Sequence, residues 1–223
     1  MSKDIAKLAS AETAIEKFIH PTDTPLIVGI GSGSTILHAV RFYCFYQAKH
    51  LIVENGLTLG DLDEFPTLDI TIDGADEIDQ NLNLIKGGGA CMTMEKVVAF
   101  NSKCLVIIVD ESKYSNYLGE KYTKGIPVEV IPASRVPVTK HLEKLGYQPV
   151  LRVAVNKAVR DNGNFVLDLK FDPKQPRDWV EENQKIKMIP GVIETGLFIK
   201  MVSNVVVGKS DKTADVVPIP TPK

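Results

Sequence analysis

The chain has 223 residues, with 26 lysines and arginines against 28 aspartates and glutamates, and a formal net charge of −2. This balance excludes the strongly basic surface with which a protein coats nucleic acid or an anionic membrane. Hydrophobic residues make up 44% of the sequence, which predicts a folded chain with a buried core. The longest apolar runs, such as residues 104–109, are too short to span a membrane. Charges within the first twenty residues interrupt any secretory signal, so a cytoplasmic protein is expected.

The first half of the chain alternates helical and strand patterns, with a glycine-rich or acidic loop after each strand. This order predicts a mostly parallel sheet with a ligand at the carboxyl ends of its strands. Helices are expected over residues 3–19, from Ile36 and from Met92 to about Asn101, and strands over residues 25–30, 68–72 and 104–109.

The second half is richer in short β segments. Asp161-Asn162-Gly163 predicts a hairpin turn, because Asn-Gly tolerates positive φ angles at both central positions. Residues 187–191 and 197–199 return to an apolar strand pattern that is expected to rejoin the main sheet, and the proline-rich residues 218–223 are expected to form a loose tail. Strands are predicted over residues 128–131, 150–155 and 165–171, and a helix over residues 138–145.

These patterns together predict an α/β protein with a doubly wound, mostly parallel, Rossmann-like sheet and a smaller α+β lobe. We expect residues 1–126 and 198–223 to form the α/β catalytic domain and residues 127–197 to form the lobe. The three cysteines, Cys44, Cys91 and Cys104, lack a C-x-x-C spacing and are interpreted as buried structural thiols. The four histidines show no zinc-binding spacing, so no metal site is predicted.

The loop after the first predicted strand is suited to a phosphate group. It places backbone N–H groups and hydroxyls of Ser32, Gly33, Ser34 and Thr35 at the start of a helix. The spacing matches neither the G-x-x-x-x-G-K-[ST] nor the G-x-G-x-x-G motif, so nucleotides are poorly supported as ligands. The alternative is a plain glycine turn in which Ser34 or Thr35 caps the helix.

Two further loops carry charged residues. Asp73, Asp76, Glu77 and Asp79 follow the second strand, and most of them are expected to face solvent or a ligand, because burying several carboxylates is unfavourable. The alternative is a solvated acidic turn. Lys86 then precedes three glycines, Gly87, Gly88 and Gly89, which allow the backbone to approach a ligand; the alternative is a flexible connector. Glu95, beside Lys96 on the next helix, is by itself most typical of a surface residue.

A phosphate loop, a pair of carboxylates, a lysine and a glutamate suffice for proton transfer on a small sugar phosphate, without a cofactor. Six motifs, in this order, resemble those of the ribose-5-phosphate isomerase family of type A. They are residues 31–35, 73–79, 86–90 with Glu95-Lys96, 127–132, 161–164 and 189–198.

The resemblance implies an aldose–ketose isomerase of the pentose phosphate pathway that acts through an enediolate, without a metal. By motif, Glu95 is the base that moves the proton between C2 and C1, Asp73 and Asp76 handle ring opening and hydroxyl protons, and Lys86 stabilises the oxyanion. The substrate-binding residues implied are Ser32, Gly33, Ser34, Thr35, Gly87, Gly88, Gly89, Lys113 and Lys7. The expected partner is a small sugar phosphate, and a homo-oligomer, either a dimer or a tetramer, is expected.

The chain departs from the family pattern after Thr35, where a second strand with a Thr- or Ser-bearing turn is usual and only residues 36–46 precede Gln47. The resemblance is also poor after Gly208. The rival hypothesis is a catalytically idle sugar-phosphate sensor or subunit that has lost this segment. Retention of Glu95, Asp73, Asp76 and Lys86 favours the enzyme.

Overall fold

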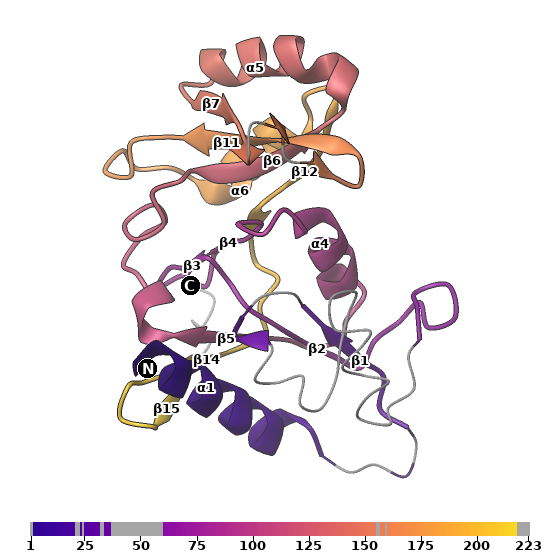
Figure 1. Cartoon of the computed structure of the whole chain (residues 1–223), viewed down its shortest axis with the longest axis vertical. Helices are drawn as coiled ribbons and strands as arrows, with labels where there is room; N and C mark the ends of the chain where they lie inside the picture. Colours follow the sequence, from indigo (N-terminus) through magenta and orange to yellow (C-terminus); the bar gives the residue numbers. More distant parts are fainter. Residues whose placement is uncertain are drawn as a thin grey trace. The chain divides into compact units, whose positions relative to one another are not determined.

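The computed structural model describes residues 2–20, 23, 25–31, 34–36, 60–154, 157–158 and 160–217 (Figure 1). Its chain contacts divide it into two compact units, which the backbone enters more than once. Unit 1 comprises Met1–Ala75, Glu95–Tyr114 and Met201–Lys223, and unit 2 comprises Asp76–Met94 and Ser115–Lys200. These units are defined by contacts within the chain. The predicted division into a catalytic domain and a smaller lobe stays a prediction.

Unit 1 contains a five-stranded sheet in the order β1-β2-β5-β14-β15. The first four strands are parallel, and β15 is antiparallel to β14. The α/β class and the mostly parallel sheet are therefore confirmed. The strands are β1 (Val28–Ile30), β2 (Ile70–Asp73), β5 (Leu105–Asp110), β14 (Asn204–Gly208) and β15 (Ala214–Val217).

Helices cover both faces of this sheet. On one face, Ala11 and Ala14 of α1 (Ser2–Phe18) pack in a buried cluster with sheet residues that include Ile30. Side chains alternate between the faces of a strand, so Gly29 faces the other way. There a Cβ on Gly29 would lie 2.8 Å from Cγ1 of Val98 in α4 (Met92–Phe100). The missing side chain at Gly29 thus allows α4 to approach the strand closely.

Unit 2 contains an antiparallel sheet in the order β10-β11-β6-β12, with β7 also paired to β11. Its core includes Val128 of β6, Leu167 of β11, Leu142 of α5 and Ile186 of α6. The elements are β6 (Ile126–Val130), η3 (Pro132–Ser134), α5 (Arg135–Lys144), β7 (Gln148–Leu151), β10 (Arg160–Asp161), β11 (Asn164–Lys170), α6 (Trp179–Lys187) and β12 (Val192–Thr195).

Two smaller sheets complete unit 2. One joins β3 (Glu77–Ile78), β4 (Leu84–Ile85) and β13 (Leu197–Phe198), and the other joins β8 (Val153–Ala154) and β9 (Lys157–Ala158). The predicted hairpin is confirmed, because β10 and β11 are antiparallel and φ is +47° at Asn162 and +83° at Gly163.

The expectation that residues 187–191 and 197–199 rejoin the main sheet is wrong. Lys187 ends helix α6, and Leu197–Phe198 pairs with β4 in unit 2. The strand that returns to the main sheet is β14, which is parallel to β5. Helix α6 was not predicted because six of its nine residues are polar or charged. Asp178, which accepts hydrogen bonds from the N–H groups of Val180 and Glu181, caps its start.

Several expectations lie outside the described residues. They concern the helix after Ile36, the strand that the family usually has there, Cys44, and the tail over residues 218–223. Within the described part of the chain, no helix is long and apolar enough to cross a membrane.

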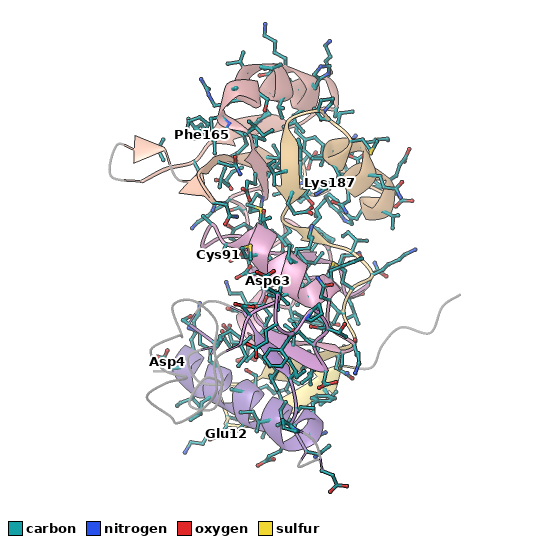
Figure 2. All side chains as sticks on the ribbon, turned by 90° about the vertical axis from the view of Figure 1, so that its right-hand side faces the viewer. Asp4, Glu12, Asp63, Cys91, Phe165 and Lys187 are labelled. Carbon is teal, nitrogen blue, oxygen red and sulfur yellow. The ribbon has the colours of Figure 1, made fainter. Side chains whose placement is uncertain are left out.

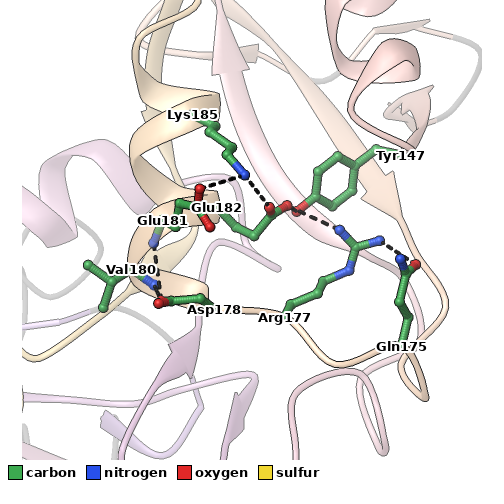
Figure 3. A network of polar contacts seen from close by, with 8 residues as sticks. All are labelled: Tyr147, Gln175, Arg177, Asp178, Val180, Glu181, Glu182 and Lys185. Atoms are coloured by element: carbon green, nitrogen blue, oxygen red, sulfur yellow. Dashed lines mark hydrogen bonds and ion pairs between the residues drawn. The ribbon is translucent and has the colours of Figure 1, made fainter.

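A polar cluster fixes α6 to the sheet of unit 2 (Figure 3). Glu182 of α6 accepts a hydrogen bond from the Tyr147 hydroxyl and pairs with Arg177 at 3.1 Å. The Arg177 guanidinium lies 4.7 Å from the Tyr147 ring centre and 5.8 Å from that of Phe171. Burial, then the hydrogen bond and charge of Glu182, raise the pKa of Tyr147.

We predict that Tyr147→Phe lowers the free energy of unfolding at pH 7 by about 1–2 kcal/mol, because it removes a buried hydrogen bond to a carboxylate. A raised pKa in the folded state contributes stability below the unfolded value of about 10 and loses it as the pH rises through the folded value. Urea unfolding measured from pH 7 to 11 should therefore show a shallower alkaline decline in the variant. An equally steep decline would contradict this role.

Candidate active site

The carboxyl ends of three parallel strands in unit 1 lead into the loops singled out in the sequence. Strand β1 is followed by Gly31, β2 ends at Asp73, and β5 ends at Asp110. The N–H of Gly31 donates to the carbonyl of Ile72 at 2.9 Å, which continues the β1–β2 pairing into the loop. The start of the glycine loop and Asp73 therefore lie at one edge of the sheet, where ligands of such sheets bind.

Lys7 of α1 contacts the glycine loop. Its Nζ atom donates to Oγ of Ser34 at 3.0 Å and lies 4.0 Å from a carboxylate oxygen of Asp4. Thr35 follows Ser34 and is half-buried, whereas Ser32 and Gly33 lie outside the described residues. A cation and a hydroxyl thus meet in this loop, and their role in phosphate binding stays a prediction.

Asp73 is 1% exposed, and one of its carboxylate oxygens accepts a hydrogen bond from the N–H of Gly74 at 2.7 Å. This carboxylate occupies the space that a side chain at position 31 would need. A Cβ on Gly31 would lie 1.5 Å from Oδ1 of Asp73. The glycine at position 31 is therefore required by the close approach of Asp73 and not only by a turn.

The prediction that most of the acidic residues after β2 face solvent or a ligand is wrong for Asp73, Glu77 and Asp79, which are at most 2% exposed. Each of them accepts at least one hydrogen bond from a backbone N–H group. Glu77 accepts hydrogen bonds from the N–H groups of Gly119 and Lys121, and Asp79 accepts from those of Asn81 and Asn83. Burial raises the pKa of Asp79 despite these bonds, because desolvation is the larger effect.

Asp76 is the member of this group that stays half-buried, and it contacts the lysine–glycine loop in unit 2. Its Oδ2 atom accepts a hydrogen bond from the N–H of Gly88 at 2.6 Å. A Cβ on Gly88 would lie 2.4 Å from Oδ1 of Asp76, so this approach requires glycine. Gly89 is exposed, and a Cβ there would meet nothing within 4 Å.

Lys86 begins this loop and is 3% exposed. Its N–H donates to the carbonyl of Gly196 at 2.8 Å, and its Nζ atom lies 5.4 Å from the ring centre of Phe198. Gly196 and Phe198 belong to the motif over residues 189–198, so the structure brings that motif to Lys86. The aromatic ring face stabilises the ammonium group in this buried position.

The two remaining predicted residues, Glu95 and Lys113, belong to unit 1, and each lies in a helix. Glu95 is in the first turn of α4, where it is half-buried (Figure 2 shows Cys91, just before this helix). Lys113 ends the 3₁₀ helix η2 (Glu111–Lys113), which begins after Asp110; the Asp110 carboxylate caps η2 by accepting from the N–H of Ser112 at 3.0 Å.

Sequence reasoning missed four buried or half-buried polar residues of unit 2: Tyr122, Glu129, Arg152 and Asp168. Glu129 is fully buried on β6 and accepts hydrogen bonds from Thr93, in the first turn of α4, and from Asn164 at 2.6 Å. Arg152 pairs with Asp168. The available signal was a charged residue within an apolar strand pattern, as in Pro127-Val-Glu129-Val and Leu167-Asp168-Leu. Among the described residues, no group of three or more His, Cys, Asp or Glu side chains is placed to hold a metal.

Comparison with known proteins agrees with this arrangement. The model of the family "Ribose 5-phosphate isomerase A (phosphoriboisomerase A)" matches residues 44–212. Proteins named ribose-5-phosphate isomerase from Sus scrofa and Dictyostelium discoideum are both 47% identical to this chain. The alignments cover 95% of this chain and 74% of the pig protein, and 97% of this chain and 99% of the Dictyostelium protein.

Solved structures give the same result. The ribose 5-phosphate isomerase A of Methanocaldococcus jannaschii is 35% identical, with a TM-score of 0.81 over 95% of this chain and 97% of its own. A D-ribose-5-phosphate isomerase in complex with phospho-erythronic acid is 32% identical, with a TM-score of 0.86 over 97% of this chain and 99% of its own. The fold is thus that of a sugar-phosphate isomerase. The chain belongs to the ribose 5-phosphate isomerase A family.

The buried acidic residues generate a stability prediction. Glu77→Gln should lower the free energy of unfolding by about 1–3 kcal/mol. The NH₂ group of the new glutamine would face one of the two backbone N–H groups that now donate to the Glu77 carboxylate. Denaturant unfolding of the variant measures the change. The same substitution at the exposed Glu143 is the control. A loss of stability no larger at Glu77 than at Glu143 would contradict the role of Glu77 as a buried hydrogen-bond acceptor.

Proposed function

We propose that this protein interconverts D-ribose 5-phosphate and D-ribulose 5-phosphate by proton transfer through an enediolate. The observation that carries the proposal is the hydrogen bond from the N–H of Gly88 to Asp76, which joins a carboxylate to the loop that Lys86 begins. Membership of the family supports the reaction. Because atoms only move within the sugar, no oxidant or second substrate is required.

The isomerisation needs a base that removes the proton from C2 and returns it to C1. We assign this role to Glu95, and assign to Lys86 the stabilisation of the oxyanion that develops on the substrate. A cation held in a buried position is well suited to that task, because its charge is weakly screened there. Asp73 and Asp76 are assigned to ring opening and to proton transfer at the hydroxyls.

The phosphate group is assigned to Ser32, Gly33, Ser34 and Thr35 with Lys7, and further substrate contacts to Gly87, Gly88, Gly89 and Lys113. The hydrogen bond from Lys7 to Ser34 supports this assignment, because it brings a cation to the glycine loop. Phospho-erythronic acid, bound in a related solved structure, is a phosphorylated sugar acid whose planar carboxylate resembles an enediolate.

The reaction would belong to the non-oxidative branch of the pentose phosphate pathway, in a cytoplasmic homo-oligomer. The rival function, a sugar-phosphate sensor without turnover, retains the phosphate loop but has no use for a base at position 95. A coupled assay for ribulose 5-phosphate, run beside a binding titration with ribose 5-phosphate, separates the two. Binding without turnover would favour the sensor.

The phosphate assignment is tested by Ser34→Ala. Loss of one hydroxyl partner should weaken binding of ribose 5-phosphate by roughly 1–3 kcal/mol while leaving the weak binding of ribose unchanged. Calorimetric titrations with both sugars measure this difference, and Ser210→Ala, at an exposed position, is the control. The assignment of the glycine loop to phosphate binding is wrong if the parent protein binds ribose and ribose 5-phosphate equally well.

The role of Glu95 is tested by Glu95→Gln, which keeps the shape of the side chain but cannot accept the proton. Turnover should fall by roughly 10²–10⁴-fold, while substrate affinity changes by only a few-fold. Exchange of the C2 hydrogen with solvent deuterium, followed by NMR, should fall in parallel. Glu16→Gln, on the exposed side of α1, is the matched control. Exchange at the parental rate would move the search for the base to Asp73 and Asp76.

A further inference from the structure

The Arg152 guanidinium connects the lysine–glycine loop to the antiparallel sheet of unit 2. Its Nη1 atom donates to the carbonyl oxygens of Gly87 at 2.6 Å and of Gly88 at 3.3 Å. Its Nε atom donates to Asp168 of β11 at 2.9 Å, and Nη2 donates to the other carboxylate oxygen. The side chains of Arg152 and Asp168 are only 14% and 13% exposed. One guanidinium thus uses both of its edges, one on the sheet and one on the loop.

The contact with Gly87 has a direct consequence for Asp76. The carbonyl of Gly87 and the N–H of Gly88 belong to the same peptide group, and no peptide bond described in the structure is cis. In a planar trans peptide these two groups point in opposite directions. Arg152 holds the carbonyl end, and Asp76 accepts a hydrogen bond from the N–H end at 2.6 Å. The orientation of this one peptide plane therefore couples Arg152 to the Asp76 carboxylate.

Glycine makes this coupling necessary. Gly87 has φ +99°, a conformation that side-chain-bearing residues rarely adopt, and Gly88 and Gly89 also lack side chains that could pack. Without an external contact, such a loop samples many peptide orientations. Arg152 supplies that contact while its guanidinium is ion-paired with Asp168 of β11.

The charge of Arg152 is maintained in this half-buried position. Burial by itself would lower the pKa of Arg152, but the hydrogen bonds and charge of Asp168, together with the charge of Asp76, raise it. Burial and the charge of Asp76 also raise the pKa of Tyr122, so this neighbour stays neutral. The guanidinium is a permanent cation near Asp76.

We propose that Arg152, held by Asp168, is a positioning residue for the isomerisation: it orients the Gly87–Gly88 peptide so that its N–H fixes the Asp76 carboxylate for proton transfer. The inference rests on the proposed role of Asp76. Arginine is needed because lysine cannot bind a carboxylate with two parallel bonds and donate to backbone carbonyls at the same time.

The test is Arg152→Lys, measured by steady-state kinetics and by thermal unfolding. We expect kcat to fall roughly 10–100-fold, the size of effect that a small misplacement of a reacting group produces, with KM changed by less than about three-fold. Arg177→Lys is the matched control, because Arg177 is also a largely buried, ion-paired arginine of unit 2, and it packs on Tyr147 and Phe171. It should lower the melting temperature and leave kcat of the folded protein unchanged.

A double-mutant cycle with Asp76→Asn separates positioning from general stability. If Arg152 acts through Asp76, the double variant should be no slower than Asp76→Asn alone. Multiplying effects would overturn the proposal. Guanidinium chloride at a few millimolar should also partly restore kcat of Arg152→Ala and have no effect on Arg177→Ala. If Arg152→Ala does not fold, Asp168→Asn, which keeps the arginine but weakens its hold, should reproduce the kcat loss.

The outcomes distinguish the two levels of inference. Parental activity in Asp76→Asn would remove Asp76 from the proposed function, whatever happens at position 152. An inactive Asp76→Asn together with a parental kcat in Arg152→Lys would leave the proposed function intact and show that Arg152 does not position the loop.

Discussion

The requirement that a buried carboxylate be hydrogen-bonded governs the acidic segment with which unit 2 begins. Glu77 and Asp79 are almost inaccessible to solvent, and each is satisfied by two backbone N–H groups. Removing a carboxylate from water is unfavourable by several kcal/mol unless donors replace the water. The acidic segment after β2 therefore mainly stabilises the fold. Its carboxylates organise the loops at residues 81–83 and 119–121, and this fixed frame leaves Asp76 as the half-buried member that faces the glycine loop.

The same requirement explains why the Lys86–Gly89 loop has a defined shape. Three glycines in succession have the largest conformational entropy to lose on folding. Hydrogen bonds from Arg152, to Asp76 and to the carbonyl of Gly196 constrain this segment from three directions. A residue with a side chain at position 88 would collide with Asp76. Glycine at this position therefore allows the close approach of Asp76 and also makes the free loop flexible.

The sequence was sufficient for the elements with strong local signals. The helix over residues 3–19, the first three strands of the main sheet (β1, β2 and β5) and the Asn162-Gly163 turn are found within a few residues of their predicted bounds. Helix α6 and the partner of Leu197–Phe198 were not predictable in this way, because one has a mostly polar surface and the other depends on pairing between distant segments. The motifs identified candidate residues such as Lys86 and Asp76. The contacts of Arg152 could not be predicted from the sequence, because its partners lie 16 and 65 residues away along the chain.

The order of strands in unit 1 has a consequence for biosynthesis. Strand β14 lies between β5 and β15, yet it is made after the whole of unit 2, and the backbone N–H of Leu105 bonds to a side chain 98 residues later. Contacts of such long sequence separation form slowly, because closing the intervening loop is entropically unfavourable. During synthesis on the ribosome, the edge of β5 that later pairs with β14 stays unpaired while the residues of unit 2 emerge. A nascent chain arrested before Asn204 therefore leaves the edge of β5 unpaired and open to aggregation.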